Sequence, residues 1–407
     1  MQKIEGGVTT PIGFLAAHTA AGIKYEDRDD MAMLFSTEPC ELAGTFTKNV
    51  VKAAPVLWDR QRVEEGRGVR AVVVNAGIAN ACTGKDGIRF CEETAEAAAD
   101  CLNIDPLQVC VASTGVIGMP LPMDRIKNGV RSMAPTLSDS REAANLAARA
   151  IMTTDTHPKE AAVCLSIHGT EVRIGGMTKG SGMIHPNMGT MLSFITTDAA
   201  ISKELLQEAL SQVVSETYNM ISVDGDTSTN DTCLLMANGL AKNEPISKED
   251  DSFSIFVEGL LEVNRTLARM MAGDGEGATA LIEAVVKGAP DKEGARKLAK
   301  SVITSSLTKA AIYGHDANWG RIMCALGYAG VEFDPERVDI TIKSEAGELP
   351  LVENGVALSY SETEASEILS KSEVQILCDI HAGDQEAVAW GCDLTYEYVK
   401  INADYRS

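Results

Sequence analysis

The chain has 407 residues, and 45% of them are hydrophobic, so it is long enough for two or three domains and can bury a large core. Its formal net charge of -22 argues against nucleic acid as a partner, because phosphate backbones are bound by clustered Lys and Arg. No apolar run reaches the roughly 18 residues of a membrane-spanning helix, so we expect no membrane partner.

Cysteine and histidine usage indicates a cytoplasmic protein without a metal. The ten Cys form no C-x-x-C pair, and neither they nor the six His have zinc-site spacing. The first residues also lack an apolar signal core and an Arg-rich amphipathic stretch. We therefore expect reduced, mostly buried thiols, no metal and no cofactor.

Strand and helix patterns alternate in the first half of the chain. Short apolar runs predict strands, and Ala-rich runs of helical period, with Ser or Asp available as a cap, predict helices. In chain order, the expected elements are a strand at 70–75, a helix at 91–102, a strand at 109–113 that ends in a turn at Thr114 and Gly115, a helix at 138–152 and a hairpin of 162–167 with 171–177.

The second half begins with a predicted strand at Thr190 and becomes strand-rich toward its end. The further expected elements are helices at 202–218, 254–271 and 291–305, and strands at 338–343, 374–380 and 386–394. Helices and strands in both halves predict a layered α/β protein, but periodicity alone does not assign its topology.

The most informative segment is a Gly-rich, Pro-punctuated loop that runs into a β-prone segment, KGSGMIHPNMGTML at residues 179–192. If the bond between Gly189 and Thr190 breaks, Thr190 gains a free α-amine beside its own hydroxyl. An unperturbed α-amine titrates at about 7.7 to 8.0, so it can serve as the general base for a Thr nucleophile. The alternative interpretation is an ordinary loop before an ordinary strand.

This loop resembles the signature of the ornithine acetyltransferases, the bifunctional glutamate N-acetyltransferases of arginine biosynthesis, which reads approximately KGxGMIxPNMATML. The resemblance extends over almost the whole chain in matched blocks of the same order. These blocks are FTKN with VKAAP at 46–55, NAGIANACTG at 75–84, STGVIG at 113–118, MTTDT at 152–156, GDGEGAT at 273–279, and GCDLTY through NADYRS at 391–407.

The resemblance implies a fold and a mode of assembly. The fold is an αββα sandwich related to that of certain self-processed aminopeptidases. Cleavage between Gly189 and Thr190 would give an α chain of residues 1–189 and a β chain of residues 190–407. The two chains would stay intertwined, in a heterotetramer of two each.

The resemblance also implies a reaction, the transfer of an acetyl group from N-acetylornithine to glutamate by a ping-pong route. Thr190 matches the nucleophile that holds the acetyl group, and Thr114 and Gly115 match the oxyanion hole. The matched substrate-binding residues are Thr153, Lys179, Thr190, Glu276, Asn402 and Ser407, the last of which stands where the family commonly ends in Thr.

Each matched residue also has a simpler structural interpretation. Thr114 and Gly115 are typical of a strand that ends in a turn, Thr153 of helix termination, and Lys179 of a solvated charge. Glu276 lies in a Gly-rich loop that lacks the register and context of a dinucleotide site, so it can be a turn carboxylate facing water. A chain end such as Asn402 to Ser407 is normally frayed.

Three positions need comment against the family pattern. Gly189 replaces the usual Ala before the nucleophile and leaves the scissile carbonyl uncrowded. Ile78 replaces a common Asn, which puts a polar contact there in doubt. His185 stands where the family often has Ala, so we expect a loop residue rather than a catalytic base. For the polar segment 315–321 we expect a structural or site-supporting network without a metal.

Two rival functions remain open at the level of sequence. A self-processed N-terminal-Thr aminopeptidase or amidase on the same scaffold would use the same Thr and oxyanion donors but release acyl groups to water. A non-enzymatic binding protein would keep the scaffold uncut. The sequence also leaves open whether acetyl-CoA serves as an acetyl donor to glutamate.

Overall fold

The computed structural model describes residues 1–185 and 191–404. It divides into two compact units, each with its own sheet. The first unit comprises Met1–Gly180, Pro186–Ser215 and Thr227–Leu267, and the second comprises Ser181–His185, Glu216–Asp226 and Ala268–Ser407. The predicted Gly189, Thr190 and Ser407 lie outside the described residues.

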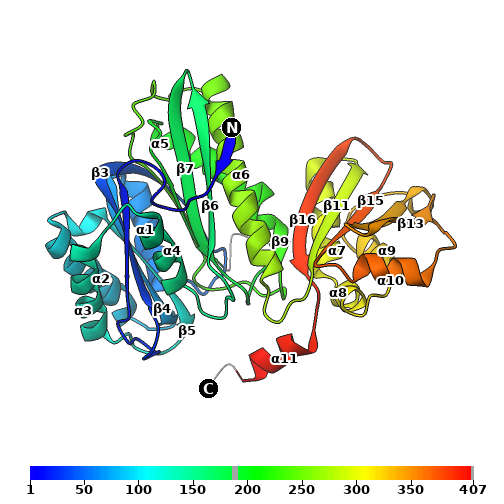
Figure 1. The fold of residues 1–407 in the computed structure, drawn as a ribbon, viewed down its shortest axis with the longest axis horizontal. Coiled ribbons are helices and arrows are strands. Elements are labelled where there is room, and N and C mark those ends of the chain that lie inside the picture. Colours follow the sequence, from blue (N-terminus) through cyan, green and yellow to red (C-terminus); the bar gives the residue numbers. More distant parts are fainter. Residues whose placement is uncertain (186–190, 405–407) are drawn as a thin grey trace. The chain divides into compact units, whose positions relative to one another are not determined.

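The first unit is built on a sheet of nine described strands in the order β1-β6-β7-β8-β10-β3-β4-β5, with β2 paired to β3 (Figure 1). The strands are β1 (Gln2–Ile4), β2 (Phe14–Thr19), β3 (Met31–Phe46), β4 (Val69–Ile78), β5 (Val109–Val116), β6 (Lys159–Ile167), β7 (Thr170–Lys179), β8 (Leu192–Thr197) and β10 (Thr232–Ala237).

The long strand β3 belongs to both halves of this sheet. Its first part pairs with β2 and β4, and its last part, from Glu41 to Phe46, pairs with β10. The pairing with β4 shifts register between Phe35 and Cys40, and Pro39, which has no N–H to donate, lies in that interval. The chain can therefore change direction there and let the two halves face each other.

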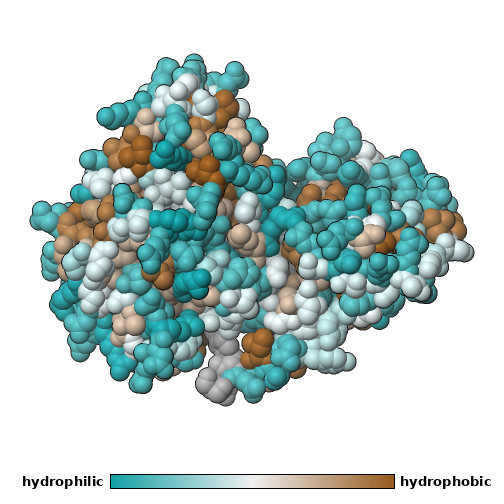
Figure 2. All heavy atoms as spheres, viewed as in Figure 1, coloured by the Kyte–Doolittle hydropathy of each residue, from teal (hydrophilic) through white to brown (hydrophobic). Residues whose placement is uncertain are grey.

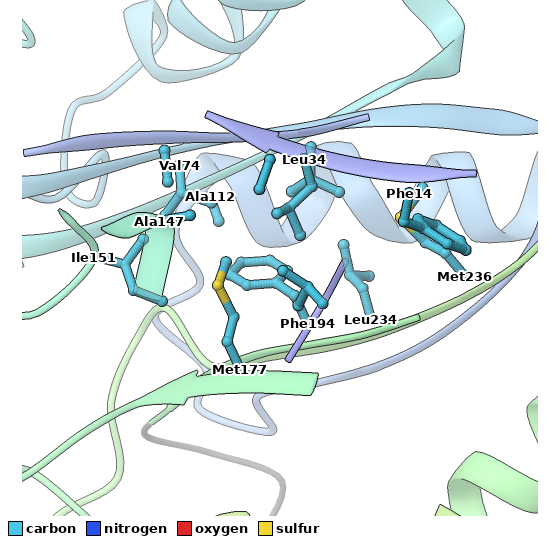
Figure 3. Packing of buried hydrophobic residues seen from close by; sticks show 14 of the residues in the cluster. Phe14, Leu34, Val74, Ala112, Ala147, Ile151, Met177, Phe194, Leu234 and Met236 are labelled. Carbon is cyan, nitrogen blue, oxygen red and sulfur yellow. The ribbon is translucent and has the colours of Figure 1, made fainter. Parts of the chain in front are cut away.

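The space between the two halves is the hydrophobic core in Figure 3. Leu34, Val74 and Ala112 come from the β3, β4 and β5 half, and Phe194 and Leu234 come from β8 and β10. All five side chains are almost fully buried. This packing gives the two inner β layers of the predicted sandwich.

Helices cover the outer faces of both halves. Helix α2 packs on β4 and β5, and α3 packs on α2, β2 and β3, on the face of the sheet that carries Val73 and Val111. On the other half, Leu267 and Val263 of α6 lie against Gly176 of β7. The helices of this unit are α1 (Ala54–Glu65), α2 (Asp86–Leu102), α3 (Met123–Met133), α4 (Arg141–Ala150), α5 (Lys203–Glu216) and most of α6 (Asp251–Gly273).

Successive side chains of a strand point to opposite faces of the sheet, so one strand packs against two neighbouring layers. In β3, Ala32 and Leu34 face the inner core, whereas Met31 and Met33 face the helices. Helix α4 is capped as expected, because Ser140 Oγ accepts a hydrogen bond from the backbone N–H of Ala143 at 3.1 Å. The predicted αββα arrangement is therefore confirmed in the first unit.

The second unit has a sheet of seven described strands in the order β14-β13-β12-β15-β11-β16-β9. Its strands are β9 (Ile221–Ser222), β11 (Leu281–Ala289), β12 (Asp339–Ser344), β13 (Gly347–Glu353), β14 (Val356–Ala357), β15 (Glu373–Asp379) and β16 (Gln385–Cys392). Its helices are α7 (Lys292–Thr304), α8 (Ser306–Tyr313), α9 (Trp319–Gly327), α10 (Glu362–Leu369) and α11 (Tyr396–Ala403). Helix α7 packs on β11 and β16.

Most of the predicted elements are confirmed within a few residues of their bounds. The prediction for β5 was too short, because the strand continues through Thr114 and Gly115 to Val116 and stays paired with β4. Not predicted were helices α1, α3, α8, α9, α10 and α11 and strands β1, β2, β3, β9, β10, β11, β13 and β14. Short 3-10 turns complete the chain at Pro106–Gln108, Ala134–Thr136, Tyr218–Met220 and Pro335–Arg337.

The polarity of the surface agrees with the high net charge of the chain. The face drawn in Figure 2 is mostly hydrophilic, with hydrophobic side chains in small separate groups. Within residues 1–185 and 191–404, no helix has the length and apolarity needed to cross a bilayer, and no three His, Cys, Asp or Glu side chains gather as a metal site. All ten cysteines lie in this part of the chain and are free thiols.

Candidate functional site

Strand β5 presents Thr114 and Gly115 in parallel register with Ala76 and Gly77 of β4. Gly115 has a φ of 127°, and a Cβ at this position would lie 2.3 Å from the carbonyl carbon and oxygen of Gly77. No other residue fits without moving one of the two strands. A glycine is therefore required beside Thr114 for reasons of backbone geometry.

Lys179, the last residue of β7, brings two of the predicted threonines together. Its Nζ lies 2.8 Å from Oγ1 of Thr153 and 3.3 Å from Oγ1 of Thr114. Lys179 is 8% exposed, so it is not the solvated charge of the simpler interpretation. Two predicted residues from separate sequence blocks thus lie within hydrogen-bond distance of the ammonium group of a third predicted residue.

A buried carboxylate completes this cluster. Asp155 Oδ1 accepts hydrogen bonds from Lys159 Nζ and from the backbone N–H of Gly180, both at 2.7 Å. Its Oδ2 accepts the N–H of Thr153 at 3.1 Å and lies 3.9 Å from Lys179 Nζ. The side chains of Asp155 and Lys159 are both 0% exposed. We call Thr114, Thr153, Asp155, Lys159 and Lys179 the lysine cluster.

The charge state of Asp155 follows from its neighbours. Burial alone would raise the pKa of this carboxyl, but the ammonium groups of Lys179 and Lys159 and the N–H of Gly180 hold its pKa well below the usual range. Asp155 is therefore an ionised carboxylate near neutral pH. Sequence reasoning missed Asp155 and Lys159, although Asp155 lies in the matched block 152–156.

The neighbouring asparagines stabilise the ends of β4 and β5. Asn75 Nδ2 donates to the carbonyl of Ile78 at 2.7 Å, and the N–H of Asn80 donates to Ser113 Oγ at 2.8 Å. Ile78 is 5% exposed and belongs to the core beneath the helices. Position 78 therefore takes part in a polar contact through its backbone carbonyl, whereas its side chain packs among apolar residues.

Asp231 is another buried carboxyl of the first unit that the sequence did not single out. It is 2% exposed, and its Oδ2 has no hydrogen-bond partner among residues 1–185 and 191–404. Burial raises the pKa of Asp231 well above its usual range, although a hydrogen bond from the N–H of Met191 lowers it in part. The carboxyl of Asp231 thus contacts the backbone of the residue that directly follows the predicted nucleophile Thr190 in the sequence.

In the second unit, the predicted Glu276 and Asn402 are in contact. Asn402 Nδ2 on α11 donates to Glu276 Oε2 at 2.8 Å, and Glu276 is 7% exposed. The N–H of Glu276 donates to the carbonyl of Ser181 at 2.8 Å. A Cβ at Gly182 would lie 2.3 Å from the Glu276 carboxyl carbon. Glu276 is thus not a turn carboxylate facing water, and glycine at 182 makes room for it.

The part of the signature loop before residue 186 is anchored by Asp224. The two oxygens of its carboxylate accept the N–H groups of Met183 at 2.6 Å and Ile184 at 2.9 Å. The N–H of Val223 donates to the carbonyl of Ile184 at 2.6 Å. Burial and the charges of Asp224 and Glu276 raise the pKa of Tyr398. The sequence did not predict roles for Asp224 or Tyr398.

His185 follows this anchored segment, and its Nδ1 lies 3.0 Å from Ser222 Oγ. Burial, and to a lesser extent the charge of Lys300, lower the pKa of His185 to about 4, so its imidazole is neutral near pH 7. Burial likewise lowers the pKa of Lys300 to about 8. His185 and Lys300 are thus two titratable groups of the second unit with displaced pKa values.

The polar segment 315–321 forms a structural network, as expected. Asn318 caps α9 by accepting the N–H of Arg321 at 3.3 Å, and its Nδ2 donates to Asp316 at 3.0 Å. Arg321 Nη1 donates to the carbonyl of Leu307 at 2.9 Å. These contacts tie the start of α9 to α8.

The layered α/β fold with a buried Lys, Thr and Asp cluster is that of an enzyme, and comparison with known proteins identifies the class as acyltransferase. Residues 15–407 match the model of the ArgJ family. The chain belongs to this family, whose members act in arginine biosynthesis.

The similarity to individual relatives extends over the full chain. This chain is 52% identical over 409 residues to the arginine biosynthesis bifunctional protein ArgJ of Symbiobacterium thermophilum, with 100% of both chains covered. It is 47% identical over 407 residues to the protein of the same name from Caldanaerobacter subterraneus, again with 100% of both covered. A crystal structure of the protein of this name from Bacillus halodurans superposes with a TM-score of 0.50 at 46% identity, covering 52% of this chain and 97% of that chain.

Proposed function

We propose that this chain transfers an acetyl group from N2-acetylornithine to glutamate through an acetyl-Thr190 intermediate, after it cuts itself between Gly189 and Thr190. The observation that carries this proposal is the contact of Lys179 with both Thr114 and Thr153, because such an arrangement places hydroxyl donors and a cation together in a buried site. Because the curated relatives are named bifunctional, we also propose acetyl-CoA as a second acetyl donor to glutamate.

Maturation needs only Thr190, its neighbour and water. The hydroxyl oxygen of Thr190 attacks the carbonyl carbon of Gly189, so that a C–O bond forms, the C–N bond breaks and the hydroxyl proton passes to the leaving nitrogen. Water then hydrolyses the ester. The products are a carboxylate on Gly189 and a Thr190 with a free α-amine and a free hydroxyl.

The transfer proceeds in two half-reactions. The α-amine of Thr190 takes the hydroxyl proton while the oxygen attacks the acetyl carbonyl of N2-acetylornithine; the amide C–N bond breaks, and the proton leaves on the ornithine nitrogen. The α-amine of glutamate then attacks the acetyl ester, so that a C–N bond forms and the ester C–O bond breaks. The proton lost by the glutamate amine passes to the Thr190 oxygen, and N-acetylglutamate leaves. Thr114 and the N–H of Gly115 stabilise the oxyanion formed in each half.

Substrate recognition follows from charge. Substrates with an α-carboxylate meet the repulsive field of a protein with a net charge of -22, so a buried cation such as Lys179 is needed for binding. Thr153 is the neighbouring hydrogen-bonding group. In the second unit, Glu276 and Asn402 are the proposed substrate-binding residues, with Glu276 suited to an ammonium group, and Ser407 is proposed from sequence alone.

Strand pairing supports the idea that the cleaved chains stay together. Strand β8 starts two residues after Thr190 and lies between β7, which precedes the cut, and β10. Strand β10 in turn pairs with β3. A chain of residues 190–407 would therefore share a continuous sheet with a chain of residues 1–189. We further propose an assembly of two of each, in the cytoplasm.

The proposal is tested by incubating the purified chain with N2-acetylornithine and glutamate. We expect two fragments on a denaturing gel, equal amounts of ornithine and N-acetylglutamate, and a mass gain of one acetyl group on the 190–407 fragment when glutamate is withheld. Thr190→Ala should stay uncut and inactive. Free acetate without glutamate would indicate the hydrolase instead, an intact inert chain would indicate a binding protein, and a parallel assay with acetyl-CoA tests the second donor.

A further inference from the structure

The contacts of Lys179 fix the direction of two hydrogen bonds. A lysine ammonium has three N–H donors and no acceptor, so the oxygen atoms of Thr114 and Thr153 must accept in both contacts. Each hydroxyl therefore keeps its own O–H group for donation to another acceptor. A hydroxyl that accepts from a cation is also a stronger donor, because the positive charge polarises its O–H bond.

We propose that Lys179 supports the oxyanion hole through Thr114, and that Asp155 and Lys159 are the positioning residues that hold its ammonium between the two threonine hydroxyls. This inference rests on the proposed function, because it takes Thr114 as an oxyanion donor. It adds a catalytic contribution to a lysine that the family resemblance assigns to substrate binding alone, and it gives roles to two residues that the resemblance does not assign.

The geometry of Asp155 supports a positioning role. Lys159 Nζ and the N–H of Gly180 fix one carboxylate oxygen, and the N–H of Thr153 fixes the other. The carboxylate thus links the end of β7, which carries Lys179, to the segment that carries Thr153. With two ammonium groups and one carboxylate, the cluster keeps a net positive charge beside Thr114.

Burial strengthens the electrostatic effect of this positive charge on Thr114. The side chains of Asp155 and Lys159 are inaccessible to water, and that of Lys179 is 10% exposed, so their electric field is weakly screened. Charge that develops on an oxygen bound by Thr114 would feel the cluster directly. Preorganised dipoles and charges of this kind do not have to reorient during the reaction.

Self-cleavage separates this role from simple substrate binding, because the uncut chain contains its own carbonyl and needs no substrate carboxylate. We therefore expect Lys179→Met to slow self-cleavage of freshly refolded protein at least tenfold and to lower kcat of the cut enzyme by about 10- to 100-fold. Lys3→Met is the matched control, because Lys3 is an exposed lysine of the same unit that pairs with Glu262, and its loss should change neither rate.

A double-mutant cycle tests whether Lys179 acts through Thr114. Thr114→Ala should cost about 10²- to 10³-fold, and adding Lys179→Met should slow self-cleavage by less than threefold more. Lys159→Met and Asp155→Asn should each slow self-cleavage by about tenfold. Because Asp155→Asn leaves two buried ammonium groups without their carboxylate, Lys159→Met provides the second measurement if that variant does not fold.

Each outcome decides between the hypotheses. A loss of cleavage rate and kcat in Lys179→Met that vanishes in the Thr114→Ala background supports the inference. Normal cleavage with only a raised KM would show that Lys179 binds substrate and nothing more, and would overturn the inference while leaving the proposed function intact. Additive effects would assign Lys179 a role independent of Thr114. A wild-type chain that neither cuts nor transfers acetyl would overturn both proposals.

Discussion

The two units differ in how they hold their predicted site residues. In the first unit, Thr114 and Lys179 lie on strands, and their positions follow from strand register around a cationic cluster. In the second, Glu276 lies in a loop, Asn402 lies on a helix without buried residues, and the nearby Asp224 is acidic. The first unit is thus suited to fix negative charge rigidly, and the second to bind a cation in a more adaptable setting.

The largest expected effect tests the rigidity of the first unit. Gly115→Ala places a methyl group 2.3 Å from the backbone of Gly77 at a φ of 127°, so we expect a loss of about 3 kcal/mol or more in the free energy of unfolding, together with loss of self-cleavage. Urea unfolding and gel analysis measure both. Gly118→Ala, at a φ of 77° with open space around it, should cost only about 1–2 kcal/mol; equal losses would contradict the argument from close contact.

An intermediate effect tests the second unit. Glu276→Gln keeps the size of the side chain but removes its charge, so we expect kcat/KM for N2-acetylornithine to fall by about 10- to 100-fold, equivalent to about 1.5–3 kcal/mol for a charge-assisted hydrogen bond. Stability should change little, because the amide oxygen can still accept from Asn402. Glu397→Gln on the exposed face of α11 is the control and should leave kcat/KM unchanged. An unchanged kcat/KM in Glu276→Gln would show that Glu276 does not bind substrate.

The smallest expected effect is a loss of folding stability at acidic pH. The pKa of His185 is about 4 in the folded chain against 6.5 in the unfolded chain, so the unfolded state binds the proton first, and the stability contributed by neutral His185 is lost as pH falls from about 6.5 to 4. Asp155, whose pKa is also depressed, loses its contribution only as pH falls below about 3.8. Protonation of His185 should therefore cost stability at a higher pH than protonation of Asp155.

Urea unfolding at pH 7 and pH 5 measures this difference. His185→Gln should reduce the loss of unfolding free energy between these pH values by about 1 kcal/mol, allowing for partial solvent screening. His157→Gln, a change of an exposed histidine in the first unit, should leave it unchanged. Identical pH dependence of wild type and His185→Gln would show that His185 titrates normally.

Much of the local structure was predictable from sequence, for reasons that are local. The short apolar run of β4 predicts a buried strand, the Ala-rich helical period of α2 predicts a helix, and Ser140 was available as a helix cap. The extension of β5 through Thr114 and Gly115 was not predictable, because a Thr-Gly pair usually ends a strand. Only the partner strand, with Gly77 opposite Gly115, permits the strand to continue.

The sequence by itself determined part of the elements, the family and the candidate residues, because periodicity and ordered motifs are properties of short segments. Only the tertiary structure decided that Lys179 is buried against Thr114 and Thr153, that Asp155 and Lys159 share its cluster, and that Asn402 contacts Glu276. The reason is that these contacts join residues from separate segments of the chain. The energy of a buried charge depends on which partners surround it, and the packed sheet brings those partners together.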